Sequence, residues 1–123
     1  MKRDPDLIRK IAFAIEELEP GQFLHQLDAM DPHLFAIHVA WMEDAGLIVA
    51  QTTKFLSGPP AVTVYRLTWS GCDFLDAARS DTLWNKAKKS VLAPGASWTF
   101  DVLKEWLKAE IKNGLPTLRS LGS

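Results

Sequence analysis

The sequence has one cysteine, Cys72, among its 123 residues, so no disulfide can form within the chain. A chain without internal disulfides is typical of proteins that fold in a reducing cytoplasm. No apolar run is long enough to cross a bilayer. Residues 1–4 lack the apolar segment that begins a secretory signal. We therefore expect a cytoplasmic protein with no membrane association.

Neither sign of charge is in excess, because 14 Lys and Arg residues face 15 Asp and Glu residues, a formal net charge of −1. A chain with this balance has no overall attraction to nucleic acids or acidic membranes. Its composition, 47% hydrophobic and 24% charged, is that of an ordinary folded protein. The length favours one domain, which we expect over residues 1–115, with 116–123 as a flexible tail.

Patterns typical of catalysis and cofactor binding are also missing. His25, His33, His38 and Cys72 show no paired metal-ligand spacing, and no glycine-rich loop is present to hold phosphates. His38 lies in an apolar helical stripe, where a buried, neutral and hydrogen-bonded imidazole is far commoner than a catalytic one. Cys72, His38 and Asp73 supply the groups of a nucleophilic site, but nothing in the sequence brings them together. We expect no enzymatic activity, no metal and no cofactor.

Apolar residues recur at helical spacing in five segments. Helices are expected over residues 5–19, 31–45, 70–78, 81–92 and 99–113. The second has the clearest ends, with Asp31 as N-cap, Pro32 in the first turn and Gly46 as a left-handed C-cap. Residues 21–30 fit either a short strand or a single helical turn.

Two segments rich in Val, Ile, Thr and Tyr, residues 47–54 and 61–68, predict a pair of strands. The loop between them ends in Gly58-Pro59-Pro60 and forms the tip of a hairpin. A helix, a hairpin and a further helix follow one another in a winged helix–turn–helix domain. The sequence therefore predicts a mainly helical α+β fold, a winged helix–turn–helix with a β-hairpin wing and additional C-terminal helices. A complete motif needs a helix within residues 21–30, where there is little room.

Four groups of residues stand in a characteristic order along the chain. They are Met1-Lys2-Arg3-Asp4 with Asp6-Leu7-Ile8-Arg9-Lys10; Ile37-His38-Val39 with Glu43-Asp44-Ala45-Gly46-Leu47-Ile48; Leu67-Thr68-Trp69 with Gly71 and Asp73-Phe74-Leu75-Asp76-Ala77; and Asp81-Thr82 with Trp84-Asn85-Lys86. As a set they resemble a bacterial and prophage family known as domain of unknown function 2513. The resemblance extends to about residue 112 and implies a winged-helix-like protein common on mobile elements. That family has no established activity, so the resemblance assigns no functional residue.

Nucleic-acid binding is the usual function of winged helices, and residues 31–45 would then be the recognition helix. Its outward face, as we assign it, has no Lys or Arg, and the carboxylates of Glu43 and Asp44 would repel phosphates. Basic residues gather instead on the later helices. The candidate nucleic-acid-binding residues are Lys86, Lys89, Lys104, Lys108 and Lys112. The alternative is that these lysines lie on solvated helix faces.

Protein binding is the second class of function that the sequence leaves open. The candidate interface residues are Phe13 on the polar side of the first helix, Ala36 and Ala40 on the outward face of the second, and Phe55 and Leu56 at the hairpin tip. In the alternative, Phe13 packs on the C-terminal helices and Phe55 folds back. We expect a non-enzymatic winged-helix binding protein of mobile-element type. The fold slightly favours a nucleic-acid-binding regulator over a module that forms a homodimer or binds and inhibits a host protein complex.

Overall fold

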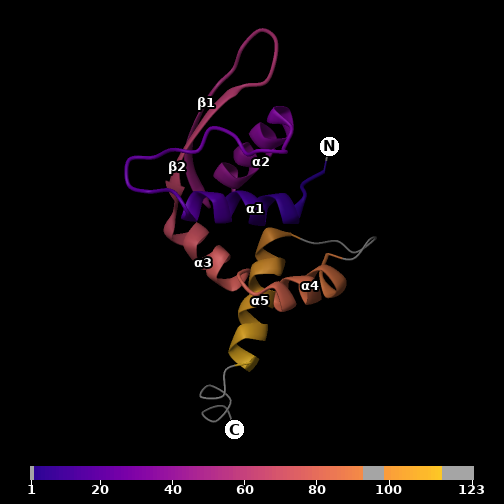
Figure 1. Cartoon of the computed structure of the whole chain (residues 1–123). Coiled ribbons are helices and arrows are strands. Elements are labelled where there is room, and N and C mark those ends of the chain that lie inside the picture. The colour runs from indigo at the N-terminus through magenta and orange to yellow at the C-terminus, as the bar shows by residue number, and fades with distance from the viewer. Residues whose placement is uncertain (1, 93–98, 115–123) are drawn as a thin grey trace. The chain divides into compact units, whose positions relative to one another are not determined.

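The computed structural model describes residues 2–92 and 99–114 (Figure 1). The chain divides into two compact units, Met1–Leu75 and Asp76–Ser123. The predicted domain over residues 1–115 stays a prediction, and the predicted tail, 116–123, lies outside the described residues. Over the described residues the fold consists of five helices and one two-stranded antiparallel hairpin, which confirms the predicted mainly helical α+β class.

The helices and strands fall close to where the sequence predicts them. They are α1 (Pro5–Glu16), α2 (Pro32–Asp44), β1 (Ile48–Thr53), β2 (Ala61–Leu67), α3 (Trp69–Ala77), α4 (Asp81–Ser90) and α5 (Phe100–Gly114). α1 ends three residues before the predicted position. The reason is Pro20, which disfavours a helical backbone at the residue before it. The chain turns there, and Gly21 follows at a φ of 86°.

α2 begins and ends within one residue of the bounds that the sequence predicts. The carboxylate of Asp31 accepts a hydrogen bond from the backbone N–H of Leu34 at 3.1 Å, and Pro32 occupies the first helical position. Gly46 has a φ of 75°, a left-handed conformation that glycine adopts without steric cost. The caps therefore fix the length of α2 through local interactions alone.

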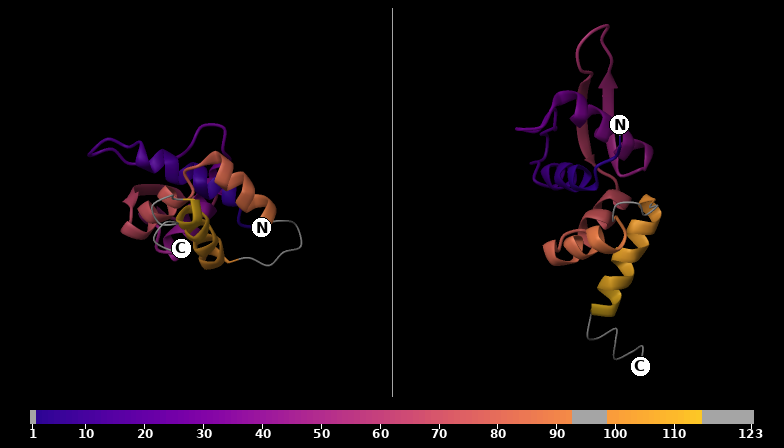
Figure 2. Two further views of the ribbon diagram at one scale, coloured as in Figure 1. Left: turned by 90° about the horizontal axis from the view of Figure 1, so that it is seen from below. Right: turned by 90° about the vertical axis from the view of Figure 1, so that its right-hand side faces the viewer.

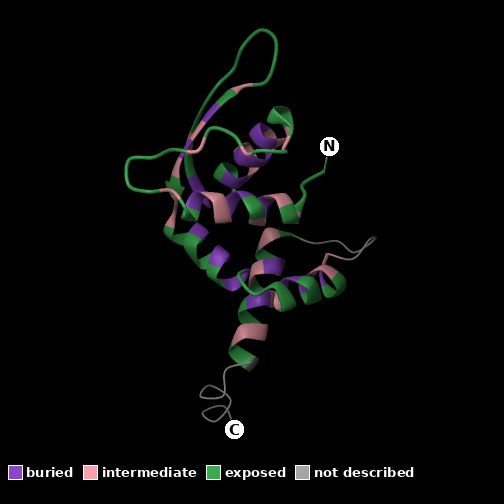
Figure 3. Cartoon of the chain, in the orientation of Figure 1, coloured by how far each residue is buried: buried purple, intermediate pink, exposed green. Residues whose placement is uncertain are grey.

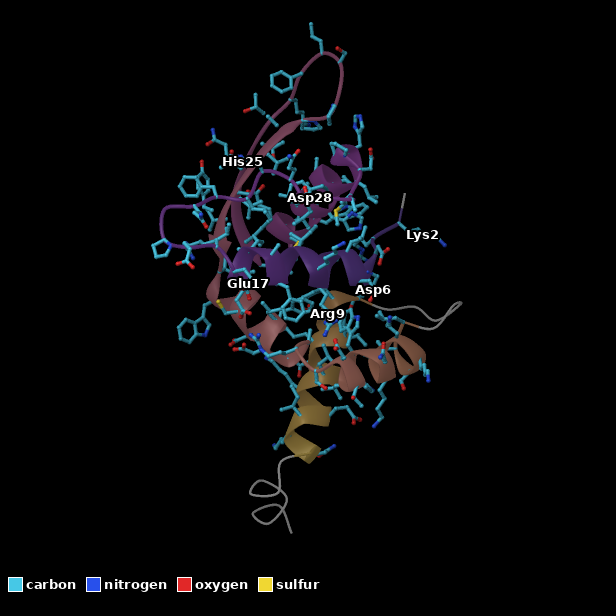
Figure 4. All side chains as sticks on the ribbon, in the orientation of Figure 1. Lys2, Asp6, Arg9, Glu17, His25 and Asp28 are labelled. Atoms are coloured by element: carbon cyan, nitrogen blue, oxygen red, sulfur yellow. The ribbon has the colours of Figure 1, made fainter. Side chains whose placement is uncertain are left out.

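Residues 21–30 form neither the strand nor the helical turn that the sequence left open. Only Leu24 pairs with the sheet, through two backbone hydrogen bonds to Val64 of 2.8 and 3.0 Å. His25, which follows in the same segment, lies beside the hairpin in Figure 4, with its Nδ1 3.2 Å from the carbonyl oxygen of Val62. The described segment 17–31 has no helix, so the helix that a complete helix–turn–helix requires before α2 is missing.

The core of the first unit lies where α1, α2 and β2 meet, and α2 also packs on β1. Its buried apolar residues include Ile8, Ile11, Ile15, Phe35, Val39, Met42, Leu47, Ile48, Val62 and Val64 (Figure 3). α2 is buried over a wider arc than its sequence pattern indicates, because it packs on a helix and on both strands. The placement of Ala36 on an outward face was therefore wrong, since only 6% of this residue is exposed.

The two ends of the hairpin are joined by a small set of hydrogen bonds. The Thr68 hydroxyl donates to the carbonyl oxygen of Gly46 and accepts the N–H of Gly71 at 3.0 Å, while the Thr68 N–H donates to the carbonyl oxygen of Leu47 at 2.8 Å. A Cβ atom added at Gly71 would lie 2.0 Å from that Leu47 oxygen. Two of the motifs in the sequence, around residues 46–48 and 67–71, therefore stabilise the base of the hairpin.

The second unit pairs α4 with α5. Ser80 caps α4 by accepting the N–H of Leu83 at 3.2 Å, and Thr99 accepts the N–H of Val102 at 3.2 Å beside the start of α5. The buried residues of the two helices are Trp84, Ala87, Leu103 and Leu107. The spacing of these residues in the sequence predicted both helices and their apolar faces.

Candidate interaction surface

A groove with a volume of about 440 Å³ lies between α2 and the hairpin. Its lining residues are His33, Ala36, Ile37, Ala40 and Trp41 from α2, and Thr52, Lys54 and Pro60 from the hairpin. The α2 residues share one side of the helix, because they occupy positions i, i+3, i+4, i+7 and i+8. Most of the lining is apolar, and Lys54 is the one Lys or Arg in it.

Small side chains on α2 keep the groove open. Ala36 is buried and Ala40 is half-buried, and both line the groove. Beside them, the Trp41 ring lies edge-on to His38, with the ring centroids 5.1 Å apart. The two alanines that the sequence indicated as interface candidates are therefore in the same groove, although Ala36 has little surface of its own.

The hairpin loop next to the groove exposes apolar side chains. Phe55 is 59% exposed and Leu56 is completely exposed, so Phe55 does not fold back onto the domain. Gly58 has a φ of 83° and is followed by two prolines, which stiffen the turn and donate no backbone hydrogen bonds. We call residues 55–59 the wing tip. The loop extends past α2 in both Figure 1 and the right-hand view of Figure 2.

The charges on this surface are few and of both signs. Glu43 and Asp44 are exposed at the C-terminal end of α2, and α2 contains no Lys or Arg. The hairpin adds two basic residues, Lys54 and Arg66. Phosphate groups are bound mainly by Lys, Arg and free backbone N–H groups. The α2–hairpin surface supplies little of that chemistry.

The five candidate lysines do not form one patch. The ammonium group of Lys86 on α4 pairs with the carboxylate of Glu110 on α5 at 2.9 Å. At about 100° per residue, Glu110 points roughly 120° away from Lys104 and about 160° away from Lys108 around α5. Lys86 therefore meets α5 on the flank opposite the ridge formed by Lys104, Lys108 and Lys112. Lys89 is exposed on α4.

Phe13 has a local reason for lying on the polar side of α1. It is half-buried, and the guanidinium group of Arg9, one turn earlier, lies 4.9 Å from the centroid of its ring. A cation over an aromatic face is attracted by the ring quadrupole. This contact stabilises the Phe13 ring within α1. The position of the ring on the polar side of the helix therefore does not by itself indicate a binding partner.

His38 is completely buried, as the sequence predicts. Its Nε2 accepts the backbone N–H of Asp4 at 2.9 Å, and its Nδ1 donates to the carbonyl oxygen of Leu34 at 2.8 Å. Because Nε2 accepts a hydrogen bond, the imidazole is the neutral Nδ1–H tautomer. Both nitrogens are thus occupied by backbone groups, and the structure does not form the Cys72–His38–Asp73 set. Within residues 2–92 and 99–114, no cluster of three His, Cys, Asp or Glu residues could hold a metal ion.

Sequence reasoning missed a second hollow, of about 410 Å³, beside the C-terminal end of α1. Phe23 and Tyr65 lie at its wall with their ring centroids 5.0 Å apart, and the Tyr65 hydroxyl donates to Gln51 at 2.8 Å. Trp69, at the first position of α3, is exposed. Trp69 does not line the hollow, so no aromatic residue at a helix start could have located it from the sequence. The pairing of Phe23 with Tyr65 depends on a tertiary contact.

The arrangement of helix, hairpin and helix defines a mainly helical α+β protein and is consistent with a winged-helix-like layout. The chain belongs to the family described as "Hypothetical protein (DUF2513)", whose model matches residues 2–97. An "Uncharacterized protein" of Haemophilus influenzae (strain ATCC 51907 / DSM 11121 / KW20 / Rd) is 31% identical over 108 residues, which cover 85% of this chain and 91% of that protein. No solved structure is significantly similar to this chain. None of the described helices is both long enough and apolar enough to span a membrane.

Proposed function

We propose that this protein is a protein-interaction module whose partner binds the α2–hairpin surface, formed by the groove and the wing tip. The observation that supports this proposal is an uncovered apolar loop beside an apolar groove. Burying a Leu or Phe side chain that was exposed contributes about 1.5–3 kcal/mol each. Phe55 and Leu56 together therefore contribute about 3–6 kcal/mol toward a contact, against the cost of association that any partner must also meet.

The same surface is poorly suited to DNA. A recognition helix needs side chains that reach base edges or phosphates. α2 instead presents Glu43 and Asp44 to solvent, and its remaining side chains are mostly apolar. The lysines of α4 and α5 lie on different flanks, and Lys86 is paired with Glu110. Nucleic-acid binding thus has the winged-helix-like layout in its favour but no concentrated basic surface.

Site-specific photo-crosslinking tests the proposal. A photoreactive amino acid replaces Leu56 in one sample and Val102 in another, in cells that express the full chain, with and without nuclease treatment. Val102 is a matched control, because it is also apolar and 52% exposed but lies on α5. We expect protein adducts from position 56 that resist nuclease and are absent from position 102. Adducts to nucleic acid alone, or equal protein labelling at both positions, would contradict the proposal.

A further inference from the structure

We propose that two copies of this chain pair through the free edge of β1, with the two β1 strands antiparallel and the two-fold axis at Gln51. The inference goes beyond the proposed function, because it concerns backbone groups of β1 and not the apolar side chains of the groove or the wing tip. The pairing joins the two hairpins into one continuous sheet and closes at two copies, since each copy uses its β1 edge once.

The direction of the backbone groups along β1 follows from the other side of the hairpin. Val64 exchanges both of its backbone hydrogen bonds with Leu24, so its N–H and C=O groups point away from β1. In an antiparallel pair, directly opposite residues point these groups either both inward or both outward, and the direction alternates along each strand. Ala50 lies opposite Val64. Ala50, and Thr52 two positions later, therefore point their N–H and C=O groups to the outer edge of β1.

These outward groups of β1 are uncovered. In the part of the chain that the structure describes, no other group forms a hydrogen bond with them. Gln51, Thr52 and Thr53 are exposed, and Ala50 is half-buried. The register of the hairpin skips Tyr65, so the extra residue of the bulge lies on β2 and β1 itself continues regularly. A regular edge strand with free backbone donors and acceptors is a template for a further strand.

The sequence of β1 fits a second copy of itself. An antiparallel copy centred on Gln51 places Ala50 of each copy opposite Thr52 of the other, and each such pair can exchange both backbone hydrogen bonds. The strand, Ile48–Thr53, contains no charged residue and no proline. Charged side chains and prolines are common devices that block an edge strand, and like charges directly opposite each other destabilise a pair. Neither obstacle is present along β1.

The charges at the two ends of β1 are complementary in this arrangement. The strand follows the exposed residues Glu43 and Asp44 and precedes the exposed residue Lys54. Antiparallel pairing places the Lys54 end of each strand beside the carboxylate end of the other and keeps the two Lys54 residues apart. Parallel pairing would bring like charges together at both ends. Because opposite charges favour encounter and fix register, the charge order along the chain selects an antiparallel second copy.

A charge swap at position 51 tests the pairing. Gln51 faces its counterpart across the two-fold axis, so Gln51→Lys and Gln51→Glu each place like charges opposite each other. By sedimentation of the full chain, we expect a monomer–dimer equilibrium for the native protein and a dissociation constant raised at least about threefold in each variant. A mixture of the two variants should form a heterodimer that is tighter than either homodimer.

The matched controls for the charge swap are Gln26→Lys and Gln26→Glu. They change an exposed glutamine outside the hairpin and should leave the dimer as it is. Position 51 is exposed as well, so all four variants should keep the native unfolding temperature. A native chain that stays monomeric up to about 1 mM, or a mixture that forms no heterodimer, would overturn the inference.

A backbone change at position 52 separates strand pairing from side-chain contact. Thr52→Pro removes an N–H that points away from β2, so the hairpin keeps its own hydrogen bonds, whereas Thr52→Ala removes only the side chain. We expect the dissociation constant to rise at least about tenfold in the proline variant and to stay within about threefold in the alanine variant. Equal dimerisation of the two variants would overturn the pairing.

Amide hydrogen exchange of the native chain gives the same answer if the proline variant unfolds. The N–H groups of Ala50 and Thr52 should exchange more slowly as the protein concentration rises, while that of Thr53, which points to β2, should not change. Exchange at these two positions that is independent of concentration would overturn the pairing. A monomeric native chain leaves the proposed function standing, because adducts from position 56 to a different protein support that function whether or not the chain dimerises.

Discussion

His38 joins two helices through both of its ring nitrogens. It accepts the N–H of Asp4, the residue that caps α1, and it donates to Leu34 within α2. The position of this histidine in an apolar stripe predicted its burial. Its partners could not be predicted, because Asp4 lies 34 positions away and the contact depends on how α1 packs on α2. His38 is therefore part of the core framework and of no reactive site.

His38→Leu should lower the free energy of unfolding by about 1–3 kcal/mol. An isolated apolar site would tolerate the change, but here leucine leaves the N–H of Asp4 without its partner and loses the bond to Leu34. Chemical denaturation of the full chain measures the difference. His33→Leu is the control, since His33 is exposed and should change stability by less than about 0.5 kcal/mol. Equal stability of the two variants would contradict the role of His38.

Gly71→Ala should destabilise the protein although alanine favours helices. Position 71 lies in the first turn of α3, where helix propensity alone predicts a gain of about 1 kcal/mol. The added methyl group would lie 2.0 Å from the carbonyl oxygen of Leu47, so the backbone at the base of the hairpin must move. We expect a net loss of about 1–3 kcal/mol, measured as a lower unfolding temperature. A gain in stability would show that the contact at Leu47 relaxes at no cost.

The elements differ in how far the sequence predicts them. α2 could be predicted to within one residue at each end, because Asp31, Pro32 and Gly46 determine its ends locally. The segment at residues 21–30 could not, because its one bridge joins Leu24 to a strand that follows much later in the chain. The sequence left open whether Phe55 is exposed or folds back, and the structure shows it exposed. The groove could not be predicted, because it forms only when α2 and the hairpin pack together.

The lysine ridge of α5 should not contribute to partner binding. Changing Lys104, Lys108 and Lys112 to Glu alters the charge of one flank of α5 and leaves the α2–hairpin surface as it is. We expect the yield of protein adducts at position 56 to stay within about twofold of the native value, because charges more than about 8 Å apart are largely screened at 0.15 M salt. Photo-crosslinking of the variant provides the measurement. Loss of these adducts in the lysine variant would move the interface to α5.

At the scale of the whole molecule, the protein has a winged-helix-like layout without the charge that usually accompanies DNA binding. Its net charge is −1, and α2, in the position of a recognition helix, ends in two exposed carboxylates. The most exposed apolar residue of the hairpin, Leu56, lies beside an apolar groove instead. The surface chemistry therefore favours a protein partner over DNA.

The most direct test is photo-crosslinking from position 56, compared with position 102, in cells that express the full chain. The account predicts protein adducts at position 56 that resist nuclease and no adducts at position 102, which is also apolar and exposed but lies on α5. Adducts to nucleic acid alone, or equal protein labelling at both positions, would contradict it.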